Sequence, residues 1–189
     1  RFDVPISVDT YKPELMDRVL LHGAAMINDI QGLASAKAKA IVAKYNVPVC
    51  LMHMQGNPQT MQNAPDYPTG VVREVCDFLM QRAQDCIDSG LHPAQIIIDP
   101  GIGFGKNLQD NLLLLKNIDE MKALGFPILI GASRKKMIGD IINQPIANRL
   151  YGSLGVAAHA MQKGVAIIRV HDVLATREML DILNSINLA

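Results

Sequence analysis

Hydrophobic and polar positions along the chain alternate between two kinds of segment. Short runs rich in Val and Ile, almost continuously apolar, are separated by longer amphipathic segments. Continuous apolar runs of this length are typical of parallel strands that are buried on both faces of a sheet. The pattern therefore predicts a parallel sheet. The predicted strands are residues 5–9, 24–30, 47–53, 95–100, 126–133 and 165–172.

The segments between these strands carry the start and stop signals of helices. Pro is favoured in the first turn of a helix and Gly just past its last turn. Strand and helix thus alternate, which predicts an α/β fold, and no linker is long enough to separate two domains. We expect one domain over residues 1–189. The clearest helix signals are Pro13 with Gly23, Val71 to Ser89 with Gly90, and the LLLLKNI segment before Gly125.

Polar side chains stand at the carboxyl end of every predicted strand. In a (β/α) barrel these ends converge on one mouth, whereas in an open doubly wound sheet only the strands near the switch point carry such residues. We therefore predict a TIM (β/α)8 barrel of which about six units are present. Either two units precede Arg1, or the sheet stays open with exposed edges. The strand-end residues are Asp9, Asn28 with Asp29, His53, Asp99, Ser133 with Arg134 and Lys135, and Arg169 with His171.

Composition narrows the possible partners. The 189 residues are 49% hydrophobic and carry 18 basic and 18 acidic side chains, so the net charge is zero. A neutral chain has no general attraction for nucleic acid or anionic lipid, and any anion site must be local. No apolar stretch reaches membrane-spanning length without interruption, and the three cysteines suggest no disulfide framework. We expect a cytoplasmic protein without nucleic-acid or membrane partners.

The glycine-rich loop at residues 96–107 is not a nucleotide-binding motif. A Walker loop would need Gly in place of Pro100 and a hydroxyl in place of Asn107. A dinucleotide fingerprint would read G-x-G-x-x-G, whereas Gly101, Gly103 and Gly105 read G-x-G-x-G. The loop instead follows a strand that ends in a carboxylate, Asp99. This indicates a ligand that presents hydrogen-bond donors.

The first half of the chain offers hydrogen-bond acceptors. Asp99 can accept two parallel hydrogen bonds, and Asn28 and Asp9 add an amide and a second carboxylate at the same mouth. Together they would bind the edge of a flat heterocycle. The alternative, that Asp99 caps its turn and Asn28 satisfies backbone groups, stays open for each residue taken alone. We interpret His53 as a hydrogen-bonded core histidine and Met52 mainly as packing, although Met can also line an aromatic pocket.

The second half offers cations. Ser133, Arg134 and Lys135 follow one strand, and Arg169 and His171 leave the next on one face. The loops after the last two strands of a barrel commonly bind phosphate. Arg169 interrupts an apolar strand, so we expect a buried guanidinium with an anionic partner. Lys136 is more simply a solvated side chain.

Taken in order, these motifs resemble the dihydropteroate synthase family. The resemblance implies a TIM barrel and a transferase that condenses 6-hydroxymethyl-7,8-dihydropterin pyrophosphate with 4-aminobenzoate. Pyrophosphate is released, and the product serves folate biosynthesis; sulfonamides target this family. The matching strings are SVDTYKPE, INDI, PVCLMHMQGNPQTMQ, DPGIGFGKN, GASRKKMIG and IIRVHD.

The resemblance also implies roles for individual residues. Lys135, Arg169 and His171 would be catalytic, and the last two would hold the pyrophosphate. Mg²⁺ is implied as cofactor, with its protein ligand in the segment before this chain, so we expect no metal ligand here. Homodimers through helices of the second half are implied as well. The implied pterin site is Asp9, Asn28, Met52, Asp99, Arg134 and Lys135; the implied 4-aminobenzoate site is Phe104, Ser133 and Lys135.

The chain departs from the family pattern in two respects. The two strand–helix units in which the family carries an Asn near the Mg²⁺ and a lid over 4-aminobenzoate have no counterpart within residues 1–189, and Ile102 stands where the family usually has Phe. We therefore expect pterin affinity with poor turnover. Two alternatives remain: a methyltransferase-type pterin-binding barrel and a non-catalytic pterin-binding module.

Overall fold

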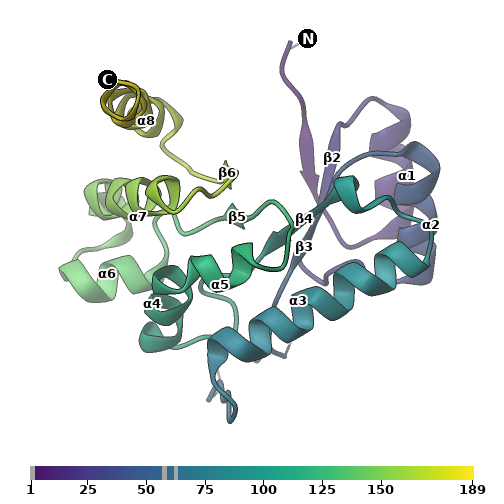
Figure 1. Ribbon diagram of the computed structural model, residues 1–189, viewed down its shortest axis with the longest axis horizontal. Helices are drawn as coiled ribbons and strands as arrows, with labels where there is room; N and C mark the ends of the chain where they lie inside the picture. The colour runs from purple at the N-terminus through teal and green to yellow at the C-terminus, as the bar shows by residue number, and fades with distance from the viewer. Residues whose placement is uncertain (1–2, 57–58, 62–63) are drawn as a thin grey trace.

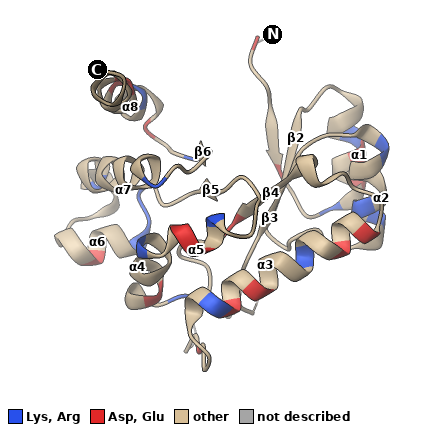
Figure 2. Cartoon of the chain, in the orientation of Figure 1, with Lys and Arg blue, Asp and Glu red and all other residues tan. Residues whose placement is uncertain are grey.

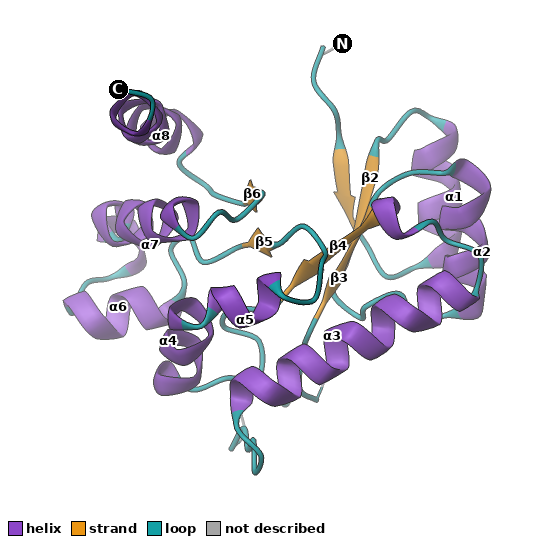
Figure 3. Ribbon diagram, in the orientation of Figure 1, coloured by secondary structure: helices purple, strands orange, loops and turns teal. Residues whose placement is uncertain are grey.

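The computed structural model describes residues 3–56, 59–61 and 64–189, in which helices and strands alternate along the chain (Figures 1 and 3). Each predicted strand contains an observed strand, always shorter than the apolar run. The strands are β1 (Ser7–Asp9), β2 (Met26–Asp29), β3 (Val49–Met52), β4 (Ile96–Asp99), β5 (Leu129–Ile130) and β6 (Ile167–Ile168). The helices are α1 (Pro13–Leu21), α2 (Ala36–Tyr45), α3 (Val71–Asp88), α4 (Leu108–Lys116), α5 (Ile118–Lys122), α6 (Lys136–Ile142), α7 (Leu150–Gln162) and α8 (Val173–Asn187), with short 3-10 helices η1 (Pro93–Gln95) and η2 (Ile146–Asn148).

Consecutive strands lie side by side and all pairs are parallel. Strands β1 to β4 form one sheet in chain order, and β5 pairs with β6. A parallel bridge between Ile98 and Ile128 links β4 to the segment that enters β5. Sequential order without a reversal is the topology of a (β/α) barrel, while a doubly wound sheet reverses its order at a switch point. The α/β barrel prediction is confirmed, with six strand–helix units in the described residues.

The arc of strands leaves β1 and β6 as its two edges (Figure 1). The two edges approach each other at their carboxyl ends, where Arg169 Nη1 just beyond β6 lies 3.7 Å from Asp9 Oδ2 at the end of β1. The arc therefore curves like a barrel wall without closing in the described residues. Its curvature brings polar groups from the first and last strands to one mouth.

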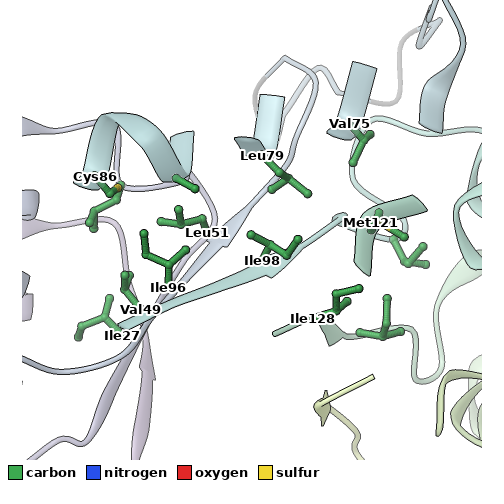
Figure 4. Packing of buried hydrophobic residues seen from close by; sticks show 14 of the residues in the cluster. Ile27, Val49, Leu51, Val75, Leu79, Cys86, Ile96, Ile98, Met121 and Ile128 are labelled. Carbon is green, nitrogen blue, oxygen red and sulfur yellow. The ribbon is translucent and has the colours of Figure 1, made fainter. Parts of the chain in front are cut away.

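Side chains along each strand alternate between two cores. The outward side chains pack against the helices, as Figure 4 shows for Leu51 and Ile98 beside Leu79 of α3. The inward ones form a smaller cluster around Cys50, Ile97 and Leu129. Each fully buried Ile or Leu contributes roughly 1.5–3 kcal/mol from the loss of apolar contact with water. The helices thus anchor the outer face of the sheet and leave the inner face for a site.

The helices between the strands confirm the predicted boundaries in part. α1 begins at Pro13 and α3 ends at Asp88, next to the predicted stops. The segment predicted as one helix up to Gly125 is two, because Asn117 leaves the helical conformation and its Nδ2 donates to the Leu113 carbonyl at 2.8 Å. Lys, Arg, Asp and Glu mix along α3 (Figure 2). Within the described ranges, no helix combines the length and apolar character needed to cross a bilayer.

Candidate active site

The register of the sheet places four predicted site residues in two successive layers on its inner face. Asp9 is the parallel partner of Asn28, and Met52 is the partner of Asp99. Since side chains alternate along a strand, Met52 and Asp99 share the inner face with Cys50 and Ile97, two residues earlier. The inner face thus changes from apolar to polar at the carboxyl ends of the strands. The sequence folds this way because each apolar run stops at these positions.

Two of these residues present buried acceptors. Asn28 donates from Nδ2 to Asp9 Oδ2 at 2.9 Å, while its Oδ1 is buried and has no hydrogen-bond partner among the described residues. Asp99 Oδ1 accepts from the Gly101 amide at 2.7 Å, so the turn-capping interpretation is confirmed for that oxygen. No described residue donates to Asp99 Oδ2. A buried acceptor without a donor costs free energy, so Asn28 Oδ1 favours a ligand that brings a donor, and Asp99 Oδ2 can accept a further hydrogen bond.

The electrostatics around Asp99 are set by burial and by cations. Burial raises the pKa of the Asp99 carboxyl, and the Gly101 hydrogen bond, Lys135 and Arg169 oppose that rise. Burial in turn lowers the pKa of Lys135 to about 8, although Asp99 pulls it upward. Acceptor and cation therefore each compensate part of the desolvation of the other.

Lys135 separates two cavities at the mouth. Its Nζ donates to the Ile102 carbonyl and lies 4.4 Å from the centre of the Phe104 ring, a cation–π distance. On that side is a cavity of about 500 Å³. It is lined by Met61, Gly103, Phe104, Lys106, Asn107, Leu108, Asn111, Lys135, Lys136, Met137 and Asp140.

The second cavity is smaller, about 220 Å³, and collects the predicted phosphate-binding side chains. The His171 backbone amide donates to Ser133 Oγ at 3.2 Å, and His171 Nδ1 lies 3.0 Å from the same hydroxyl. Arg169 crosses directly over Gly131, where an added Cβ would lie only 3.1 Å from Nε. The cavity therefore offers a guanidinium, an imidazole and an ammonium to an anion. It is lined by Gly131, Ser133, Lys135, Arg169, Val170 and His171.

Comparisons with known proteins identify the family of the chain and support its fold. Residues 1–171 match the family model described as pterin binding enzyme. A dihydropteroate synthase of Haemophilus influenzae is 44% identical over 182 residues, covering 96% of this chain and 66% of the relative. The crystal structure of the Yersinia pestis dihydropteroate synthase with a sulfonamide drug complex is 40% identical with a TM-score of 0.96, covering 100% of this chain and 68% of that one.

A third similar protein is the dihydropteroate synthase of Thermus thermophilus in complex with 6HMPPP. It is 42% identical with a TM-score of 0.91, and the match covers 96% of this chain and 72% of that one. These identities extend over almost the whole chain. The chain belongs to the pterin binding enzyme family. It spans about two thirds of the length of the curated relatives it matches.

Two members of the predicted pterin and pyrophosphate sites lie differently from expectation. The Arg169 side chain is 47% exposed, so the expectation of a buried guanidinium is wrong, although its carboxylate partner exists in Asp9. The reason is that β6 has a neighbour on one side only. Arg134 turns out of both cavities and forms a two-point ion pair with Asp172, from Nε to Oδ2 at 2.9 Å and from Nη2 to Oδ1. Its φ of +58° lies in the left-handed region, which is uncommon for a residue other than Gly.

Other strand-end residues serve the fold of this pterin binding enzyme. Asp29 points outward, where its carboxylate caps the Gln31 and Leu33 amides at 2.8 and 3.1 Å. His53 is buried and makes an edge contact with the Phe78 ring at 4.9 Å, as a core histidine would. Residues 57, 58 and 62 of the PVCLMHMQGNPQTMQ motif lie outside the described residues.

Sequence reasoning missed the groups that fasten the glycine-rich loop. Asn111 Oδ1 accepts from the Gly103 amide at 2.6 Å, and the Tyr67 hydroxyl donates to the Gly105 carbonyl at 2.6 Å. Lys106, the last residue of the GFGK string, is buried and hydrogen-bonded to the Phe104 carbonyl at 2.9 Å. A lysine that directly follows a glycine-rich strand-end loop is the signal that could have identified this contact.

Proposed function

We propose that this chain provides the pterin-binding and pyrophosphate-binding part of a dihydropteroate synthase. The observation that carries the proposal is the buried acceptor pair of Asn28 and Asp99 beside the cations Lys135 and Arg169. A dihydropterin bears an amino group next to ring N–H groups, which matches the acceptors, and its pyrophosphate matches the cations. Solved structures of the Thermus thermophilus relative in complex with 6HMPPP and with 4-aminobenzoate support both substrate classes.

In the proposed reaction, the chain's residues act by orientation and charge. Asn28 and Asp99 hold the pterin edge, so that its methylene carbon faces the boundary between the two cavities. The bond from that carbon to pyrophosphate breaks, and the charge that develops on the leaving group is stabilised by Arg169, His171 and Lys135. The neutral aromatic amine of 4-aminobenzoate attacks the same carbon and then loses a proton. No strong base is needed.

The second substrate is assigned to the larger cavity, with Phe104 as one wall and Lys135 at the junction. Ser133 was predicted beside 4-aminobenzoate, but it contacts His171 and lines the smaller cavity. We therefore propose that Ser133 serves the pyrophosphate end, where its hydroxyl orients the imidazole. Arg134 was implied in the pterin site, and we propose that it holds Asp172 instead.

The resemblance also implied Mg²⁺. Within the described residues no group of three or more His, Cys, Asp or Glu is placed to hold a metal ion. The side chains near the pyrophosphate cavity are mainly cationic, which does not fit a protein metal site there. We therefore assign the charge stabilisation to Arg169, His171 and Lys135 and derive no step through the ion.

Two further properties remain proposals. An apolar groove of about 400 Å³ between α4, α6 and α7 includes Leu112, Ile141 and Val156, and we propose that it contributes to a homodimer. Ile141 is 53% exposed, so substitution by Glu would disrupt such an interface at little cost to the fold. Sedimentation equilibrium of the native chain and Ile141→Glu measures this. A cytoplasmic location stays a prediction.

Calorimetry followed by product detection tests the proposed function. Dihydropterin pyrophosphate is titrated into the chain, and pyrophosphate release is then measured after addition of 4-aminobenzoate. We expect tighter binding of the pyrophosphate form than of the pterin alone, with slow release. Binding without release would favour the non-catalytic module, methyl transfer from methyltetrahydrofolate would favour the methyltransferase-type barrel, and absence of binding would contradict the site itself.

A further inference from the structure

Lys106 is a buried cation without a carboxylate partner. It is 3% exposed, and it forms no ion pair with any described residue. Its Nζ lies 2.9 Å from His53 Nδ1, 2.9 Å from the Phe104 carbonyl oxygen and 3.5 Å from the His53 carbonyl oxygen. A buried ammonium is costly unless its donors are used. Here all three nearby acceptors belong to two loops, the one after β3 and the one after β4.

These two loops approach each other more closely than side chains would allow. A Cβ on Gly101 would lie 1.9 Å from the His53 carbonyl oxygen, and one on Gly105 would lie 2.7 Å from the Gln55 carbonyl oxygen. Both glycines have positive φ, at +68° and +62°. The glycines therefore permit the contact, and Lys106 supplies an attraction that holds it. Without the Lys106 ammonium, the His53 and Phe104 carbonyl oxygens would lose the donor that they share.

The state of His53 fits this role. Burial and the neighbouring Lys106 charge lower the pKa of His53 to about 3, so its imidazole is neutral and Nδ1 can accept from the ammonium. Burial lowers the pKa of Lys106 to about 7, against the pull of Asp99. The other charged groups that act on Lys106 are Lys135 and Asp110. Lys106 therefore has a pKa close to neutral pH, and the acceptors of its hydrogen bonds are uncharged groups.

The Phe104 contact connects Lys106 to the site. The Phe104 carbonyl accepts from Lys106, and the Phe104 ring lies against Lys135 Nζ. Both lysines line the larger cavity. We propose that Lys106 is a positioning residue that clamps the two loops together, so that the Phe104 ring is held as one wall of the aromatic second-substrate site. This inference rests on the proposed function for the identity of that substrate.

The experiment compares Lys106→Met with a control, Lys122→Met, an exposed lysine at the end of α5. Met keeps the length of the side chain and removes the ammonium. We expect amide hydrogen exchange in residues 101–107 to accelerate about tenfold or more, because local opening becomes easier. We expect 4-aminobenzoate affinity, measured with the pterin site filled, to fall about tenfold, since Phe104 is no longer fixed. Affinity for dihydropterin pyrophosphate should change less than about threefold.

If Lys106 only stabilised the fold, the Lys106 variants would give a different combination of affinities and melting temperature. Lys106→Met removes the cost of burying an unpaired ammonium together with its three hydrogen bonds, so the two changes oppose each other and the melting temperature should change little. A fall of both affinities together with the melting temperature would overturn the proposal, and so would unchanged exchange in residues 101–107. In Lys106→Ala, added propylammonium should restore 4-aminobenzoate affinity, and failure to do so argues against the clamp. If the native chain binds no pterin, the proposed function fails, whereas the exchange measurement still decides whether Lys106 holds the loops.

Discussion

The acceptor side and the cation side of the mouth are built differently. Asn28 and Asp99 belong to the four-stranded sheet, are 4% and 3% exposed, and are fixed by strand register. Arg169 and His171 follow a strand of two residues that has one neighbour, and Arg169 is 47% exposed. A buried, rigid edge suits recognition by hydrogen bonds. A more exposed cationic edge suits a leaving group such as pyrophosphate, which must dissociate after the reaction.

The largest loss of ligand affinity should come from a substitution on the acceptor side. Asp99→Ala removes the buried carboxylate, so the donors of a bound pterin would lose their acceptor at a cost of about 2–4 kcal/mol in binding free energy. Calorimetry with dihydropterin pyrophosphate measures the loss. Asp29→Ala is the matched control, because Asp29 is also buried at a strand end but caps Gln31 and Leu33 on the outer face. If Asp29→Ala weakens pterin binding as strongly, the inward acceptor layer is not the recognition site.

The cation side should discriminate between two forms of the ligand. Arg169→Ala should weaken binding of the pyrophosphate form by about 1.5–3 kcal/mol, the range for hydrogen bonds to charged groups. Binding of the pterin without pyrophosphate should change much less. Titration of both ligands into the variant and into Arg73→Ala, an exposed arginine of α3, measures the difference. Equal weakening of both ligands would show that Arg169 acts through Asp9 and not on phosphate.

Lys135 lies between the acceptor side and the cation side, and its titration should make the affinity for pyrophosphate depend on pH. Since its pKa is lowered to about 8, its charge is present below about pH 7 and is lost as pH rises through 8. Phosphate groups are already ionised above pH 7, so affinity for pyrophosphate should fall between about pH 7 and 9. Stability should change in the opposite direction. The folded pKa lies below the ordinary value of 10.5, so the cost of burying the charge is relieved as pH rises from 8 towards 10.5.

The pH effect is checked by calorimetry at several pH values and by urea unfolding over the same range. Lys135→Met should bind weakly at every pH, with a flatter profile. Lys106 lines the same cavity, and its pKa is also lowered, to about 7. A Lys106→Met profile that stays as steep as that of the native chain assigns the titration to Lys135. A flat native profile would contradict the role given to this lysine.

The fold could be predicted largely because the apolar runs are continuous. The IIID run becomes β4 with its carboxylate at the end, and period-two alternation then fixes which side chains face inward. The break between α4 and α5 could not be predicted, because it depends on Asn117 bonding to the backbone of its own helix. Helix α7 had no clear signal in the sequence, because Gly152 and Gly155 interrupt the segment and its apolar residues do not alternate with polar ones at helical spacing.

The candidate site was predictable where strand position alone determines it. Asp9, Asn28 and Asp99 share the inner face at one end of the sheet because each ends a parallel strand, with Asp99 two residues further along the register. The direction of Arg134 was not predictable, because it depends on a positive φ and on Asp172, 38 residues away. Nor was the burial of Lys106, which depends on how closely the loop after β3 crosses the loop after β4. Contacts between two loops produce no periodic pattern of apolar residues in the sequence, so they cannot be predicted from it.

The smallest predicted effect tests whether the two halves of the sheet differ in packing as well as in exposure. Ile98 of β4 is fully buried, while Ile168 of β6 is partly exposed and packs against the same core. Ile98→Val should lower the free energy of unfolding by about 0.5–1.5 kcal/mol, the usual cost of a lost buried methyl. Ile168→Val should cost less than about 0.5 kcal/mol. Urea unfolding of both variants measures this, and equal losses would mean that β6 is as firmly packed as β4, leaving the exposure of Arg169 without a structural cause.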